Sequence, residues 1–265
     1  MANKRFFRAV AGAGALILAS VGPVWADAFQ DGVKALQANQ YAVALETWQK
    51  AAEAGDAQSQ YGMGYLNQFG LGTTVDNAQA TAWYEKAATQ NNPDAQYALG
   101  LMYESGRAPG PRDRAKALIL YREAATSGKS PAAEYALGRV YLRGDGVMRD
   151  EKEGIIWVTR AADDGQPAAQ YMLGEAYEVG TVVKQSKIDA YYWYSAALDG
   201  DQAVLHGTDP EFDPKAALEA LTQRMSQWDV EDAKAKLKKT PPPGSTPPQP
   251  APVSKAPVAQ TGTKG

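Results

Sequence analysis

A five-residue motif recurs four times along the chain at nearly constant spacing, and this periodicity constrains the fold more than any other feature. In each copy a Gln or Glu and then a Tyr precede a glycine, and the glycines recur at intervals of 36, 38 and 36 residues. Repeats of this length are typical of stacked helical units, each of which buries its apolar face against its neighbours. The copies are Gln60–Gly64, Gln96–Gly100, Glu134–Gly138 and Gln170–Gly174.

The residues around the motif predict two helices in every unit. Apolar or small residues lie five and one positions before the motif glycine and two and six positions after it, which is one face of a helix that we name helix A. A second glycine is expected to end helix A, and a helix-capping residue then precedes the run that we name helix B. These ending glycines and capping residues are Gly70, Gly106, Gly144 and Gly180, and Asp76, Asp113, Asp150 and Ser186.

The motif glycine itself predicts a close contact between helices. A glycine inside a helix costs about 1 kcal/mol relative to alanine, so four such glycines in register indicate that a neighbouring helix approaches each of them. Proline is tolerated in the first turn of a helix, and Pro93, Pro131 and Pro167 stand where helix A is expected to begin.

Together with its loop, each unit resembles the Sel-1-like repeats, which are relatives of the tetratricopeptide repeats. Gly138–Asp150 carries the resemblance most fully, and it continues into the aromatic and Ala-Ala pairs of helix B. Three places depart from the pattern: Asn67 replaces a Tyr, residues 108–111 alter one loop, and residues 181–183 lack the second loop glycine. The resemblance implies an all-α fold, a right-handed α-solenoid superhelix of Sel-1-like, tetratricopeptide-like helix-turn-helix repeats.

The period divides the central part of the chain into repeats. Four Sel-1-like repeats are expected within 57–202, at about 57–93, 94–130, 131–166 and 167–202. Residues 27–56 are expected to form a shorter, tetratricopeptide-like N-terminal repeat, because Gly32 precedes Gly64 by only 32 residues. Residues 203–239 are predicted to be C-terminal capping helices, over 214–225 and 229–238, with Ser226 and Asp229 at capping-box spacing.

The two ends of the chain differ from the repeats in composition. Residues 1–26 are predicted to be a signal peptide cut after Ala26, since a basic start precedes a short apolar stretch and a small-x-small site. An uncleaved anchor is the alternative, and Lys4 favours the general secretory over the twin-arginine route. Residues 240–265 hold 8 of the 16 prolines and no aromatic residue, which predicts a disordered proline-rich tail. The expected location is therefore periplasmic or secreted.

Few residues in the chain carry catalytic or ligand-binding chemistry. The absence of cysteine excludes disulfides, thiolate metal sites and a cysteine nucleophile. The single histidine, His206, is expected in an exposed loop, and neither a serine-nucleophile motif nor a phosphate loop is present. A net charge of -3 gives no basis for nucleic-acid binding. We therefore expect a protein that is not an enzyme and has no cofactor or metal.

Two classes of function remain open. The first is an interaction scaffold or regulator that binds a protein or peptide partner in the cell envelope with the concave face of the solenoid, without being integral to the membrane once processed. For this class the resemblance implies roles in envelope signalling or in the control of exopolysaccharide and motility. The second is a cell-wall-related enzyme or glycan binder, since cysteine-rich relatives are linked to β-lactam hydrolysis. The lack of cysteine and of a nucleophile motif disfavours it.

A partner-binding face is predicted from the positions one, four and five residues after each motif glycine. Their spacing places them on one face of helix A, and variation among the units indicates that the common fold does not require a particular residue there. Apolar groups beside arginines are typical of binding sites, although a merely solvated face is the alternative. The residues are Tyr65, Gln68, Phe69, Leu101, Glu104, Ser105, Arg139, Leu142, Arg143, Glu175, Glu178 and Val179.

Overall fold

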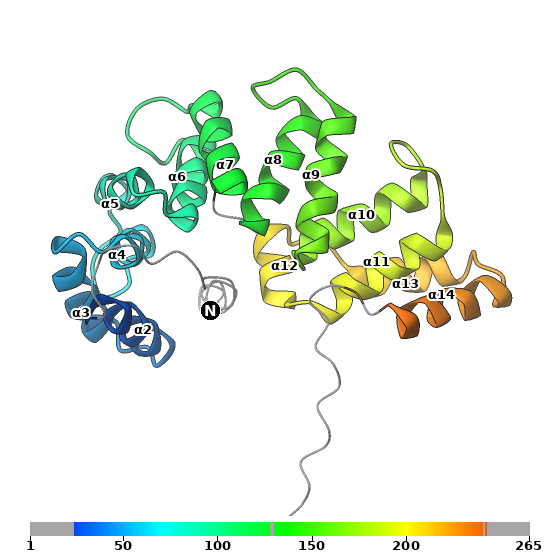
Figure 1. The fold of residues 1–265 in the computed structure, drawn as a ribbon, viewed down its shortest axis with the longest axis horizontal. Helices are drawn as coiled ribbons and strands as arrows, with labels where there is room; N and C mark the ends of the chain where they lie inside the picture. The colour runs from blue at the N-terminus through cyan, green and yellow to red at the C-terminus, as the bar shows by residue number, and fades with distance from the viewer. Residues whose placement is uncertain (1–23, 128–129, 241, 243–265) are drawn as a thin grey trace, which may run out of the picture.

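Residues 24–127, 130–240 and 242 are described by a computed structural model. In these residues thirteen α-helices and no strand are present, so the predicted all-α fold is confirmed. The helices are arranged as an arc (Figure 1). They are α2 (Val24–Gln37), α3 (Tyr41–Glu53), α4 (Ala57–Phe69), α5 (Asn77–Thr89), α6 (Pro93–Ser105), α7 (Arg114–Ser127), α8 (Pro131–Arg143), α9 (Glu151–Asp163), α10 (Pro167–Val179), α11 (Lys187–Asp199), α12 (Gln202–Thr208), α13 (Pro214–Thr222) and α14 (Gln227–Lys239).

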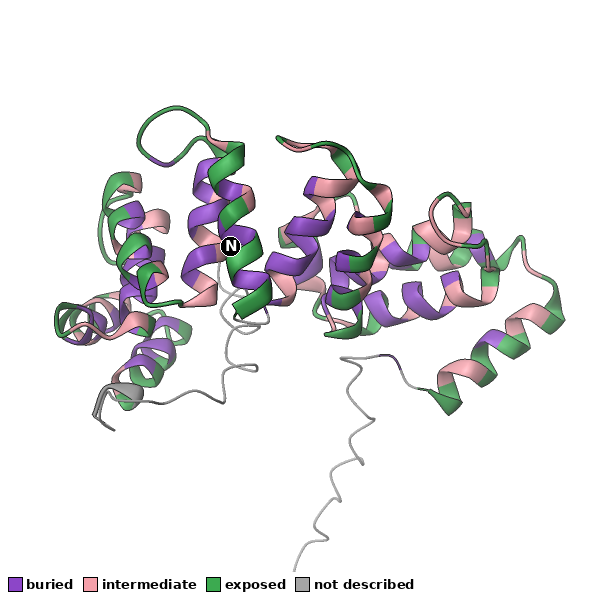
Figure 2. Ribbon diagram, turned by 45° about the horizontal axis from the view of Figure 1, so that its top comes forward, coloured by how far each residue is buried: buried purple, intermediate pink, exposed green. Residues whose placement is uncertain are grey.

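Successive helices form hairpins, and the hairpins stack into the solenoid. We call α2/α3 the N-terminal unit, and α4/α5, α6/α7, α8/α9 and α10/α11 units 1 to 4, with helix A first in each. In units 1 to 4, helix A packs most extensively on helix B of its own unit and next on helix B of the preceding unit. On the limb that carries α2 to α5, α2 and α4 lie toward the hollow of the arc (Figure 1). Buried residues gather where helices face one another, and the loops are largely exposed (Figure 2).

The predicted helix ends are confirmed in all four units. The glycine that follows each helix A is left-handed, with φ of 65°, 72°, 73° and 76° from unit 1 to unit 4. Each predicted capping residue of helix B accepts a hydrogen bond from the backbone N–H three residues further on. Pro93, Pro131 and Pro167 stand in the first turn of helix A. These signals are local, so sequence spacing alone is enough to place them.

The close approach at the motif glycine is also confirmed, and the neighbour is helix B of the same unit. A Cβ atom on Gly64, Gly100 or Gly174 would lie 2.5, 2.5 or 2.6 Å from a tyrosine ring of helix B. In unit 3 a Cβ on Gly138 would lie 2.7 Å from Val158. Any side chain at these positions would therefore push helix A and helix B apart.

In three of the four units the first residue of the motif joins the unit to the preceding one, a role that the sequence analysis did not assign. In units 1, 2 and 4 it is a glutamine whose side-chain amide donates to a carbonyl oxygen near the end of the preceding helix B. The bonds run from Gln60 to Ala52 at 3.1 Å, from Gln96 to Ala88 at 3.5 Å and from Gln170 to Ala162 at 3.2 Å. Unit 3 has Glu134 instead, and because a carboxylate cannot donate to a carbonyl, it pairs with Arg160 of α9 at 3.1 Å.

The C-terminal helices cover the last unit of the solenoid. α12 packs mainly on α10, whereas α13 and α14 pack on α11. His206 lies inside α12, so its expected place in a loop was wrong; Asp201 caps this short helix with a side-chain oxygen. The predicted capping box of Ser226 and Asp229 is confirmed. α13 ends at Thr222, earlier than predicted, because the chain turns before Ser226, which caps α14.

Most of the predicted signal peptide and of the predicted proline-rich tail lies outside the described residues. Residues 24–26 begin α2, and Thr240 and Pro242 are the described part of the tail. In the described part of the chain, no helix is both long enough and apolar enough to cross a membrane.

Candidate partner-binding face

The predicted binding residues lie on helix A of units 1 to 4, and we call their surface the helix A face. Tyr65 is buried, whereas Ser105, Arg143, Glu175 and Val179 are exposed. The remaining side chains are partly buried, which means that most of the face also contacts the rest of the solenoid. They are Gln68, Phe69, Leu101, Glu104, Arg139, Leu142 and Glu178.

At unit 1 and unit 2 the face contains an apolar patch made by Tyr65, Phe69 and Leu101. The rings of Tyr65 and Phe69 lie 4.7 Å apart at an angle of 53°, and Phe69 and Leu101 are only partly buried against the core. Burial raises the pKa of Tyr65 to about 12, so its phenol stays neutral near pH 7. Tyr65, Phe69 and Leu101 therefore give this end of the face a hydrophobic patch without a permanent charge.

Variation at the fourth position after the motif glycine follows the residue that faces it from helix B. In units 1, 2 and 4 a tyrosine hydroxyl of helix B donates to this side chain, from Tyr84 to Gln68 at 2.7 Å, from Tyr121 to Glu104 at 2.6 Å and from Tyr194 to Glu178 at 2.8 Å. In unit 3 helix B has Val158 at this register, and the fourth position is Leu142, which packs closely over Gly154. The assumption that variation here is independent of the fold was therefore wrong, since a buried hydroxyl needs an acceptor.

A row of tyrosines continues the face three positions before each motif glycine. Tyr61, Tyr97 and Tyr171 each lie beside the helix B tyrosine of their unit, with ring centroids 5.8, 5.8 and 5.3 Å apart. Tyr135 of unit 3 has no tyrosine in that place, and the guanidinium of Arg139 lies 5.7 Å from its ring centroid. Unit 3 therefore replaces an aromatic pair with a cation and an aromatic ring.

The C-terminal part of the chain covers part of the face at unit 4. Phe212, between α12 and α13, stacks on Tyr171 with centroids 4.4 Å apart and an angle of 21°. Arg224 of the segment after α13 pairs with Glu178. Partial desolvation, together with the nearby Glu178 and Asp209, raises the pKa of Glu175. These contacts cover Tyr171 and Glu178, although Glu175 and Val179 of unit 4 are themselves exposed. The part of the face that no C-terminal residue is seen to cover is therefore the part on units 1 to 3.

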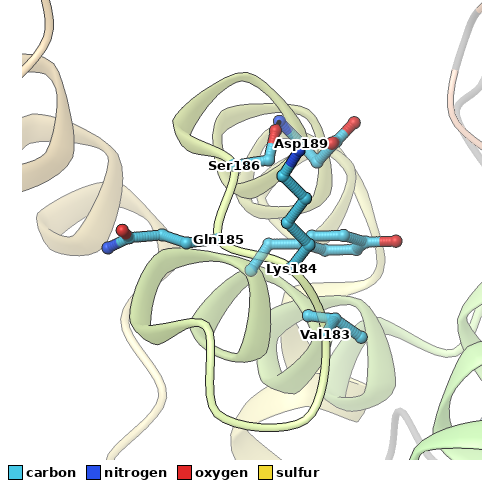
Figure 3. Close-up of a pocket in the computed structure, with 6 residues that line it drawn as sticks. Val183, Lys184, Gln185, Ser186 and Asp189 are labelled. Carbon is cyan, nitrogen blue, oxygen red and sulfur yellow. Dashed lines mark hydrogen bonds between the residues drawn. The ribbon is translucent and has the colours of Figure 1, made fainter.

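A surface pocket at the loop between α10 and α11 offers little chemistry. Ser186 caps α11, Asp189 pairs with Lys236, and Gln185 Nε2 donates to the carbonyl oxygen of Glu178 at 2.8 Å. Gln185 extends to one side of the pocket and Ser186 and Asp189 to another (Figure 3). Within the described ranges, no three His, Cys, Asp or Glu residues are grouped so that they could hold a metal ion.

The pairing of Glu104 with Tyr121 predicts a strong coupling between these two positions. Glu104→Leu should lower the free energy of unfolding by about 1–3 kcal/mol, because the Tyr121 hydroxyl loses its acceptor in a buried place. In a Tyr121→Phe background the same change should cost much less, since no hydroxyl is left unpaired. Urea denaturation of the four proteins of this double-mutant cycle measures the coupling; additive effects would contradict the structural role.

Comparison with known proteins identifies the repeats. The Sel1 repeat family pattern matches five segments, which are residues 25–56, 57–92, 93–129, 131–166 and 167–201. Four of them correspond to units 1 to 4, and the first covers the segment that was expected to form a shorter, tetratricopeptide-like repeat.

Relatives of known sequence or structure have the same repeats. The chain is 35% identical over 88 residues to the chitin synthase regulator SKT5 of Saccharomyces cerevisiae, a match that covers 33% of this chain and 12% of the yeast protein. The structure is similar to that of a Sel1 repeat protein from Oxalobacter formigenes, with a TM-score of 0.59, 26% identity and coverage of 80% of this chain and 89% of the other.

A further solved structure has the same fold at lower identity. It is the immunity protein Pa5087 from Pseudomonas aeruginosa, with a TM-score of 0.55, 20% identity and coverage of 85% of this chain and 90% of the other. Because the family pattern matches most of the residues from 25 to 201 and the helices have the arrangement of a Sel1 solenoid, the chain belongs to the Sel1 repeat family.

Proposed function

We propose that this protein is an exported, non-catalytic scaffold or regulator that binds a protein or peptide partner with the helix A face of units 1 to 3. Sel1 repeats typically mediate protein–protein interaction, and stacked repeats offer an extended surface for a partner. One observation carries the proposal for this chain: the face is open over units 1 to 3 and combines the apolar Phe69 and Leu101 with the cationic Arg139 and Arg143. Such mixtures are favoured at the centres of protein interfaces.

The cell envelope is the proposed place of action, on the basis of the predicted signal peptide. There we propose a regulatory role, in envelope signalling or in the control of exopolysaccharide and motility. The protein would act beside an enzyme that makes a polysaccharide. The regulatory name of the yeast relative supports this choice, although the two chains match over only 88 residues. If the site after Ala26 is used, the exported protein should begin at Asp27 and leave cells by osmotic shock. N-terminal sequencing that finds residue 1 in the membrane fraction would contradict cleavage after Ala26 and favour the uncleaved anchor.

Capture of the partner from an envelope extract tests the binding face. Immobilised full-length protein should retain its partner, and the triple variant Leu101→Ala, Arg139→Ala, Arg143→Ala should lose it, because the change removes the apolar and cationic groups together. Tyr65 is left unchanged because it is buried and its loss would also disturb folding.

The control is a matched triple variant that removes two arginines and one leucine from other parts of the surface. Leu198→Ala, Arg114→Ala, Arg122→Ala changes the same residue types at exposed positions outside the helix A face, and it should retain the partner. If both triple variants lose the partner equally, or if both retain it with unaltered melting curves, the partner does not bind at this face.

A further inference from the structure

Unit 3 differs from the other units at several positions of the same register. Its helix B has Val158 where units 1, 2 and 4 have tyrosine, and its fourth position after the motif glycine is Leu142 in place of a hydrogen-bonding side chain. Where the other units place Tyr65, Leu101 and Glu175, unit 3 has Arg139. Among units 1 to 4, unit 3 therefore has the cation Arg139 and lacks the tyrosine pair.

Arg139 has a charge that the surrounding protein does not neutralise. No acidic side chain in the described ranges lies within ion-pair distance of its guanidinium, and its Nε atom is buried without a hydrogen-bond acceptor. The face of the Tyr135 ring, which has an opposite partial charge, lies 5.7 Å from the guanidinium. An unpaired, partly buried guanidinium is costly, because burial removes water that would otherwise solvate it.

Two acidic residues in this region, Glu104 and Asp209, already have other partners. Glu104 accepts the hydroxyl of Tyr121 at 2.6 Å, and Asp209 accepts the backbone N–H of Glu211 at 3.1 Å. Asp209 lies close enough to raise the pKa of Tyr135, but it forms no ion pair with Arg139. Arg143 follows one helical turn later on the same face, is exposed, and likewise pairs with no acidic side chain of the described residues.

The fold does not require a cation at this position, since Leu101 occupies the same register in unit 2. We infer that Arg139 and Arg143 bind the carboxylates of an acidic segment of the partner polypeptide, with Arg139 as the central contact and Leu101 and Tyr97 as the apolar surface beside it. A carboxylate satisfies the free guanidinium donors with charge-assisted hydrogen bonds. This inference rests on the proposed function and adds the chemistry of the partner.

Two isolated arginines fit an acidic peptide better than a nucleic acid. A polyanion is bound by clustered Lys and Arg that neutralise many phosphates, whereas this chain has a net charge of -3 and only two basic residues on the open part of the face. Aromatic and apolar side chains beside the arginines also suit a peptide whose acidic residues alternate with hydrophobic ones.

Selection from a phage library of random dodecapeptides on the immobilised full-length protein tests the inference. Enriched peptides should contain Asp or Glu next to apolar residues. Their affinity, measured by fluorescence anisotropy, should fall more than about tenfold in Arg139→Leu and should weaken as salt is added. Arg139→Leu should melt at or above the temperature of the unaltered protein, because it copies the residue of unit 2 and removes an unpaired charge.

The matched control is Arg122→Leu, which removes one exposed arginine of α7 and should leave peptide affinity unchanged. The inference would be overturned if the enriched peptides lacked acidic residues or if no peptide were enriched. It would also be overturned if Arg139→Leu bound the peptides as tightly as the unaltered protein, whether or not its melting temperature were lower. If Arg139→Leu still captures the envelope partner while the triple variant loses it, the proposed function holds and the acidic-segment inference fails.

Discussion

Trp48→Ala should lower the free energy of unfolding by about 3–5 kcal/mol, the largest effect that we expect from a single substitution in this chain. The indole is fully buried between α2 and α4, and a Cβ on Gly32 or Gly62 would lie 2.0 or 2.6 Å from it. Its Nε1 donates to the carbonyl oxygen of Phe29 at 3.1 Å, and its ring stacks on that of Phe29 at 5.8 Å. Alanine would leave a cavity where the N-terminal unit joins unit 1.

The same substitution at Trp228 provides the control. Trp228 is 68% exposed in α14, so Trp228→Ala should change the free energy of unfolding very little. Urea denaturation followed by circular dichroism measures both variants. A small loss for Trp48→Ala would mean that the N-terminal unit is not packed against unit 1 as described.

The second large effect is expected for Gly100→Ala. The sign of its change in the free energy of unfolding shows whether helix propensity or packing dominates at this position. Propensity alone predicts a gain of about 1 kcal/mol, because alanine is the better helix former. The structure predicts a net loss of about 1–3 kcal/mol, since the new Cβ would lie 2.5 Å from the ring of Tyr121. That ring cannot move aside easily, because it is fully buried and its hydroxyl is bound by Glu104.

Thermal melting of the Gly100→Ala protein decides between the two. An increase in melting temperature would show that helix A and helix B are farther apart in unit 2 than the structure has them. Gly64→Ala and Gly174→Ala should repeat the loss, because tyrosine rings lie over those glycines in the same way.

The helices could be predicted from the sequence because their signals are local. Asp150, for example, is a capping residue directly before an amphipathic run, and Gly144 is a glycine where a left-handed residue must end the helix. His206 shows the limit of such signals. Glycine and aspartate nearby favoured a loop, but Asp201 caps a short helix whose residues Val204 and Leu205 are buried, so tertiary packing outweighed local preference.

The residues of the helix A face all lie on helix A of units 1 to 4, but what each one contacts could not be predicted. Glu104 and Leu142 look equally free in the sequence. The first accepts a tyrosine hydroxyl from a residue 17 positions further on, and the second packs over Gly154. In units 1, 2 and 4 the residue four positions after the motif glycine pairs with the residue eight positions after the helix B cap. A comparison of these two positions across the units would have revealed the pairing from the sequence.

The repeat spacing by itself determined the number of units, the helix ends and the need for glycine at each helix crossing, because these depend on backbone conformation and on contacts within one unit. Only the tertiary structure decided which polar side chains are used within the solenoid and which remain available. Gln60 and Arg139 both lie on helix A, yet the amide of Gln60 meets the carbonyl oxygen of Ala52 while Arg139 meets no acidic side chain of the described residues. That difference depends on residues brought together by stacking, since the partners of a polar group are set by the neighbouring helices and not by its own.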